Sequence, residues 1–178
     1  MKNRTKILKM VLAALFLALT YVMPFLTGQI PEIGAMLCPM HIPVLLCGFI
    51  CGWPWGLGVG FAGPLLRSVL TGGFPPMFPT AICMALELAV YGGVSGLMHK
   101  VLPRKKPYIY LSLLTAMIVG RLVWGGAMFF CLSAQGGVFT FGAFIAGAVT
   151  NAIPGIIVQI VLIPILVMLL DNLKLNNK

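Results

Sequence analysis

Long apolar runs make up most of this chain, and they are long enough to cross a lipid bilayer. The 178 residues are 60% hydrophobic and only 8% charged, whereas soluble domains contain about 25% charged residues. A helix that crosses the hydrocarbon core needs about 20 apolar residues. The sequence therefore predicts an all-α integral membrane protein that forms a single transmembrane domain over residues 1–178.

Positively charged residues gather in three clusters, which indicate how the chain lies in the membrane. Cytoplasmic flanks of membrane helices are rich in Lys and Arg, and the clusters hold ten of the 12 Lys and Arg residues of the chain. The clusters are Lys2/Arg4/Lys6/Lys9, Lys100/Arg104/Lys105/Lys106 and Lys174/Lys178. We therefore expect both termini and the loop 99–107 to be cytoplasmic. The net charge of +9 then reflects membrane orientation and does not require a nucleic-acid partner.

Glycine and proline residues divide the apolar runs into six predicted crossings, because these residues favour turns. The expected helices cover about 7–25, 39–52, the following stretch up to 70, 79–98, 108–132 and 141–170. The last would be about 45 Å long if unbroken, and Pro154 and Pro164 are expected to kink it. The segment 39–52 is short for a crossing. Reading it as a re-entrant segment instead would place the Lys100–Lys106 cluster outside the cell.

Three ionisable side chains fall inside the predicted crossings: Arg67, Glu87 and Arg121. A charge near the bilayer centre costs about 2.5–3.5 kcal/mol on insertion scales, so such a residue indicates a functional site. Two arginines against one glutamate leave a surplus positive charge, which predicts a pocket for an anionic small molecule. The alternative is an Arg67–Glu87 pair with polar contacts between helices. That alternative leaves Arg121 unexplained, because a guanidinium stays charged and needs an anion or several carbonyls.

Polar residues on four of the predicted helices share one depth in the membrane. With a rise of about 1.5 Å per residue, one polar side chain on each of the last four helices falls in the outer half of the membrane. These side chains are Arg67, Glu87, Arg121 and Asn151. Aromatic residues lie near the charges on two of these helices. We therefore expect a ligand pocket that opens outward. The candidate substrate-binding residues are His41, Arg67, Glu87, Tyr91, Arg121, Trp124 and Asn151.

Motifs for catalysis and metal binding are weak in this sequence. Ser95 lies in a Gly-x-Ser-Gly motif of the kind found in rhomboid proteases, with His99 one turn away. Ser95 is predicted near the cytoplasmic end of its helix, however, and the last two helices contain no histidine, so we interpret the motif as a packing seam of small residues. His41 and His99 are predicted at opposite membrane faces, and Cys47 with Cys51 lacks a third ligand. Without a Gly-x-x-x-x-Gly-Lys-Ser/Thr loop for ATP, we expect no enzymatic activity, no metal site and no cofactor.

A pair of small residues lies one turn apart in the first predicted helix, at Ala14 and Ala18. A small-xxx-small face of this kind lets another helix approach closely. The approaching helix could belong to the same bundle or to another protein. Both interpretations stay open on this pair alone.

Several further motifs are spread over nearly the whole chain. They are Pro39–Leu45, the glycines Gly48, Gly52, Gly56, Gly58 and Gly60, and the segments Gly63–Ser68, Phe78–Ala81 and Glu87–Gly92. With six spans, a basic start and the alanine pair, they resemble the substrate-binding S component of an energy-coupling factor (ECF) vitamin transporter. The resemblance implies a multi-pass protein of the prokaryotic plasma membrane that binds a vitamin or related micronutrient at its outer face.

The resemblance also implies partners and a mobile cover for the ligand. The loop 26–38 would close over the ligand, and the Ala14/Ala18 face would dock a membrane-embedded T component driven by two ATPase subunits. S components exist for pantothenate, folate, riboflavin, niacin and queuosine precursors, and the surplus positive charge favours a pantothenate-like anion. The alternative is a proton-coupled secondary transporter or channel for a small solute, with Glu87 as the coupling carboxylate. Inverted repeats would support that alternative, but residues 1–70 and 79–170 show no convincing similarity.

Overall fold

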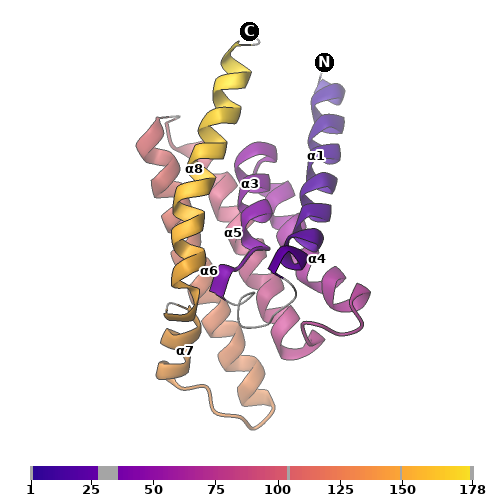
Figure 1. Cartoon of the computed structure of the whole chain (residues 1–178), viewed down its shortest axis with the longest axis vertical. Helices are drawn as coiled ribbons and strands as arrows, with labels where there is room; N and C mark the ends of the chain where they lie inside the picture. The colour runs from indigo at the N-terminus through magenta and orange to yellow at the C-terminus, as the bar shows by residue number, and fades with distance from the viewer. Residues whose placement is uncertain (1, 28–35, 104, 149, 177–178) are drawn as a thin grey trace.

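A computed structural model of the chain describes residues 2–27, 36–103, 105–148 and 150–176. Within these ranges the regular elements are all helical, and both termini lie at one end of the bundle (Figure 1). The turn that follows Val101 and precedes Lys106 lies at that same end. The chain segments that carry the three basic clusters therefore share one end, as the positive-inside rule requires.

The six crossings expected from the sequence are all present as helices. The first five are α1 (Lys2–Val22), α3 (His41–Cys51), α4 (Trp53–Leu70), α5 (Ile82–Val101) and α6 (Lys106–Ala134), and the sixth comprises α7 (Phe141–Ala148) and α8 (Ile153–Asn176). Short helical turns are η1 (Met23–Thr27), η2 (Met77–Ala81) and η3 (Thr150–Ala152). By length and composition, 4 described segments could each span a membrane, namely Arg4–Phe25, Met77–Val101, Lys106–Ala134 and Phe141–Leu170. Of the predicted loop 26–38, residues 28–35 lie outside the described ranges.

The last apolar run differs from the single kinked helix predicted from its prolines. The turn η3 divides it into α7 and α8, and Pro154 occupies the first turn of α8. Proline is accepted in the first turn of a helix, but in the interior its ring clashes with the carbonyl four residues earlier. In a continuous helix that carbonyl would belong to Thr150, which is where the break occurs. Pro164 remains inside α8.

Glycines allow α4 and α5 to pack backbone against backbone. A Cβ added to Gly92 would lie 2.2 Å from the carbonyl oxygen of Gly56, and one added to Gly60 would lie 2.2 Å from that of Leu88. No side chain larger than hydrogen fits at these positions. Ser95 lies in the same seam, where its hydroxyl donates a 3.3 Å hydrogen bond to the Gly92 carbonyl. This contact agrees with the interpretation of Ser95 as a packing residue.

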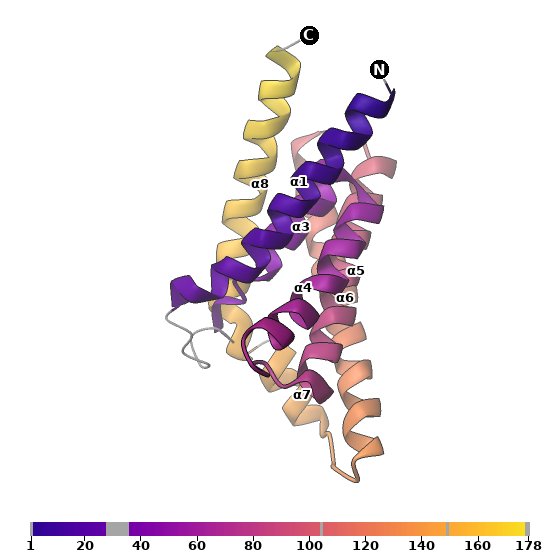
Figure 2. The ribbon, with the colours of Figure 1, turned by 90° about the vertical axis from the view of Figure 1, so that its right-hand side faces the viewer.

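Helix α5 is surrounded by other helices, because it packs against α3, α4 and α6. Helix α1 packs against α3 and α4 (Figure 2), and α8 contacts α3 and α6. The hydrophobic core between these helices includes the fully buried Leu45, Leu88, Leu113 and Ile163. Polar side chains on the buried faces of α5 are therefore held in an apolar interior.

Candidate functional site

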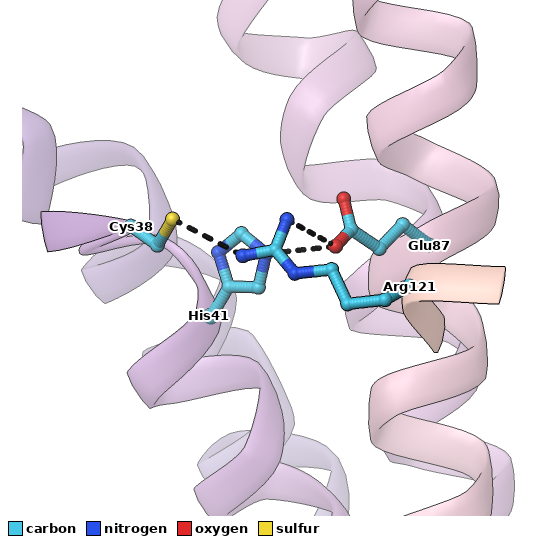
Figure 3. Close-up of polar contacts among 4 residues, drawn as sticks. All are labelled: Cys38, His41, Glu87 and Arg121. Carbon is cyan, nitrogen blue, oxygen red and sulfur yellow. Dashed lines mark hydrogen bonds and ion pairs between the residues drawn. The ribbon is translucent and has the colours of Figure 1, made fainter. Parts of the chain in front are cut away.

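Glu87 lies in α5 and is almost completely buried, with 1% of its surface exposed. Its Oε1 atom is 2.9 Å from Nη1 of Arg121 on α6 and 3.5 Å from Nε2 of His41 at the start of α3 (Figure 3). The three side chains come from three helices and point toward one another. Because an unpaired buried carboxylate is strongly disfavoured, the Arg121 counter-charge is what allows Glu87 to occupy the interior.

Cys38 joins this group from the segment directly before α3. Nη2 of Arg121 donates to the Cys38 thiol at 3.6 Å (Figure 3), and the backbone N–H of His41 donates to the Cys38 carbonyl at 3.1 Å. Cys38 has a φ of 46°, a left-handed conformation that is uncommon for residues other than glycine and that clusters at functional sites. Cys38 was not among the predicted site residues, because it is the last residue of the predicted loop 26–38 and a free cysteine is ordinarily a packing residue. Only the backbone conformation and the arginine contact distinguish it.

Tyr91 lies one turn after Glu87 on the same face of α5 and is fully buried. Its ring centroid is 5.0 Å from that of His41, and the two planes are tilted by 59°. Gly120 makes room for the tyrosine, because a Cβ added there would lie 2.3 Å from its ring atoms. We call the side chains that meet here the buried polar group: Cys38, His41, Glu87, Tyr91 and Arg121.

Several polar atoms of the buried polar group lack hydrogen-bond partners. Within the described part of the chain, the buried side-chain N and O atoms without a hydrogen bond are His41 Nδ1 and Nε2, Glu87 Oε1, Tyr91 Oη, Arg121 Nε, and Nε2 and Oε1 of Gln159. Two of them still have a close polar neighbour, because Glu87 Oε1 pairs with Arg121 at 2.9 Å and lies 3.5 Å from His41 Nε2. A buried polar group left unsatisfied costs about 1–3 kcal/mol. Such costs are expected where a ligand supplies the missing partners.

Arg67 is placed differently from the prediction. Its Nη1 atom donates to the backbone carbonyl of Tyr21 at 3.5 Å, and its Cζ is 5.7 Å from the ring centroid of Phe25. Among the described residues, Glu87 pairs with Arg121 and contacts His41 instead, so the Arg67–Glu87 pair of the alternative interpretation is not formed. The reason is the packing of α4 against α1: a Cβ added to Gly63, one turn before Arg67, would lie 2.7 Å from a side chain of α1. The arginine on that face turns toward α1.

Trp124 and Asn151 are not among the side chains of the buried polar group. Trp124 lies on α6 and faces α7, with its ring centroid 6.1 Å from that of Phe139 and 6.4 Å from that of Phe144. Phe144 also lines an open, largely apolar cleft of about 340 Å³ between these helices. Asn151 is exposed in the η3 turn. A role for either residue in substrate binding therefore stays a prediction.

Gln159 is a candidate functional residue that the sequence analysis missed. It lies on α8 and is 1% exposed, and both polar atoms of its amide are among the unpaired atoms above. Gln159 and Asn151 are the two side-chain amides in the apolar run 141–170, and this is the sequence signal that would have identified Gln159. An amide costs less to bury than a charge, so the sequence marks Gln159 less clearly than it marks Glu87 or Arg121.

The fold and the buried polar group define an all-helical, multi-pass membrane protein that holds ionisable side chains in its interior, with several of their polar atoms unpaired among the described residues. A family model described as the substrate-specific component of ECF transporters matches residues 8–167. This match covers most of the chain, so the chain belongs to that family of substrate-binding S components, as its motifs predicted. Proteins of the family bind a small-molecule substrate and associate in the membrane with T and ATPase components. No curated protein and no solved structure gives a significant match.

Proposed function

We propose that this chain binds a vitamin or related micronutrient, most favourably a pantothenate-like anion, at the outer membrane face and delivers it to an ATP-driven ECF transporter. Family membership supports the transport role. One observation carries the proposed site: a glutamate and an arginine meet in an apolar interior among unpaired polar atoms. Small-molecule sites typically combine apolar walls with a few convergent polar groups that fix the orientation of the ligand.

Arg121 is the proposed contact for the negative charge of the ligand. Two of its nitrogens contact Glu87 and Cys38, whereas Nε has no hydrogen-bond partner within the described ranges. A guanidinium presents five N–H donors in a planar fork, so it can bind a carboxylate while Glu87 holds it in place. We assign Glu87 to orienting Arg121 and not to contacting the anion.

The charge of the buried polar group bears on the choice of ligand. Arg121 and Glu87 cancel, so the group is neutral with a neutral His41 and carries one positive charge when His41 is protonated. The surplus positive charge inferred from the sequence is therefore smaller at this point than the count of arginines suggested. We propose that His41 and Tyr91 add directed hydrogen bonds, so that recognition depends on donors and acceptors as well as on charge.

Three predicted site residues are proposed to act farther out, along the approach to the buried polar group. Arg67 contacts Phe25, directly before the loop 26–38, so closure of that loop over a ligand would act on Arg67 first. Trp124 and the exposed Asn151 lie on or beside α6–α8, and we propose that they line the approach on that side.

The face of α1 that carries Ala14 and Ala18 is the proposed docking surface for the T component. Both alanines are exposed, whereas Ala13, Phe16 and Thr20 on the other face are buried against the bundle. Other residues of α1 therefore pack against the bundle, which was the alternative role for the two alanines. Small exposed residues one turn apart let a second membrane helix approach closely.

Uptake of radiolabelled pantothenate tests the proposed function, in cells that produce the chain with or without a T component and its ATPases. We expect accumulation only when the complete transporter is present. Accumulation with the chain alone would overturn the proposal in favour of the proton-coupled secondary transporter. Uptake of a different vitamin by the complete transporter would retain the S-component role and reject the choice of ligand.

A further inference from the structure

The amide of Gln159 on α8 is buried with neither its donor nor its acceptor paired among the described residues. Buried side-chain amides in proteins are ordinarily hydrogen-bonded on both sides. Because Gln159 is uncharged, no ion pair explains its place in the interior. Both halves of this amide are therefore available to a bound molecule.

The position of Gln159 along α8 sets it level with the buried polar group. One turn earlier, a Cβ added to Gly155 would lie 2.7 Å from the carbonyl oxygens of the two residues that directly precede Cys38. Helix residues four apart share a face and lie about 6 Å apart along the axis. From there α3 and α8 run in the same direction and are in contact (Figure 1). Gln159 therefore corresponds in depth to His41, in the first turn of α3.

We propose that Gln159 determines substrate specificity by pairing with an amide-type group of the ligand, one that presents a hydrogen-bond donor beside an acceptor. This inference rests on the proposed function, because it takes the buried polar group to be the ligand site. The glutamine amide itself offers both kinds of atom, so a carboxamide, a lactam or a ring edge with N–H beside C=O satisfies both halves at once. A carboxylate offers only acceptors and leaves the amide oxygen unpaired.

Arg121 and Gln159 are assigned to different parts of the ligand because a guanidinium only donates hydrogen bonds, whereas an amide both donates and accepts. Arg121 takes the acceptor or anionic end of the ligand, and Gln159 reads the neutral donor–acceptor edge from the side of α8. A site built to hydrogen-bond its substrate discriminates strongly against an analogue that lacks the group, because the buried polar atoms of the protein are then left unpaired. Gln159 thereby selects among small anions that Arg121 alone would accept equally.

The test compares Gln159→Leu with Gln135→Leu, a matched change at an exposed glutamine, in the purified full chain. Thermal unfolding of washed, ligand-free protein is measured first. Removing an unpaired buried amide in favour of an apolar side chain of similar size should raise the unfolding temperature by about 2–4 °C.

Calorimetry then compares pantothenate, which carries an amide and a carboxylate, with nicotinate, which carries a carboxylate and no amide. Gln159→Leu should weaken pantothenate binding about tenfold to a hundredfold and leave any nicotinate binding unchanged.

The two readouts separate failure of this inference from failure of the proposed function. A lower unfolding temperature in Gln159→Leu, with unchanged pantothenate affinity, would show that Gln159 pairs inside the protein and would overturn the inference. If the unmodified chain binds no pantothenate, the proposed ligand fails, and a lower unfolding temperature in Gln159→Leu would by itself overturn the inference. Gln135→Leu should match the unmodified chain in every measurement.

Discussion

Nη1 of Arg121 lies 2.9 Å from Oε1 of Glu87, so an ion pair joins α6 to α5 in the interior of the bundle. The two side chains are 15% and 2% exposed. Breaking a buried pair by removing one partner costs about 3–5 kcal/mol, although the pair itself contributes little net stability over an apolar replacement. We interpret this pair as a fixed support for a ligand and not as a stabilising contact.

Glu87→Gln should harm stability more than it harms the binding of an anion. The neutral amide leaves Arg121 buried without its counter-charge, and the free energy of unfolding should fall by about 3 kcal/mol. An anionic ligand then supplies the lost charge and should restore much of the difference. Thermal unfolding with and without pantothenate measures both effects. A loss of affinity greater than about a hundredfold would instead mean that Glu87 contacts the ligand directly.

Gly120→Ala should disturb the site through Tyr91. The added Cβ would lie 2.3 Å from the tyrosine ring, whereas nothing lies within 4 Å of a Cβ added to Gly126 on the same helix. Overpacking of this kind typically costs about 1–3 kcal/mol, while alanine in place of glycine in a helix otherwise gains up to about 1 kcal/mol. Gly120→Ala should therefore lower the unfolding temperature and the ligand affinity, and Gly126→Ala should lower neither. Equal behaviour of the two variants would contradict this packing of α5 against α6.

The double change Ala14→Trp and Ala18→Trp should abolish ATP-driven uptake and leave ligand binding by the isolated chain nearly intact. The two bulky rings occupy the space that a helix of the T component needs, and the exposed face of α1 is separate from the buried polar group. Uptake and calorimetry are measured in parallel. Ala146→Trp, at an exposed alanine of α7, is the matched control and should transport normally. Unimpaired uptake by the double variant would move the docking surface elsewhere.

The loop between α5 and α6 should be cytoplasmic, together with both termini. A cysteine introduced as Lys105→Cys, in a background without the 5 native cysteines, should resist membrane-impermeant thiol reagents in intact cells. Val138 lies in the turn between α6 and α7 and is 86% exposed, so Val138→Cys should react from outside. The reverse pattern would invert the predicted orientation of the helices.

The crossings were predictable because each depends mainly on its own stretch of sequence. A run of about 20 apolar residues must cross the bilayer as a helix whatever its neighbours are, so α1, α5 and α6 followed from composition. The break between α7 and α8 was less predictable. Pro154 indicated that the helix could not continue undisturbed. A kinked helix and two separate helices both relieve the clash of its ring with the backbone, and packing decides between them.

The interior charges were predictable, whereas their partners were not. The cost of burying Glu87 and Arg121 identified both residues from the sequence. Helical rise gives the depth of a residue but not which neighbour its side chain turns toward. An Arg67–Glu87 pair was therefore compatible with the sequence, although Arg67 contacts Tyr21. Gln159 has no charge to mark it, and its role depends on the neighbours that α8 meets.

Small molecules that co-purify with the protein measure directly whether Arg121 holds the ligand. Mass spectrometry is applied to the unmodified chain, Arg121→Ala, Arg121→Lys and the exposed control Arg4→Ala after identical purification. Losing one member of a desolvated charge pair costs about 2–5 kcal/mol, so Arg121→Ala should lose the bound compound through an affinity lower by about tens- to thousands-fold. Arg121→Lys keeps a positive charge beside Glu87 and should retain part of the compound, because a point charge replaces a planar fork. Equal amounts of one compound in the unmodified chain and in folded Arg121→Ala would contradict the assignment of the site.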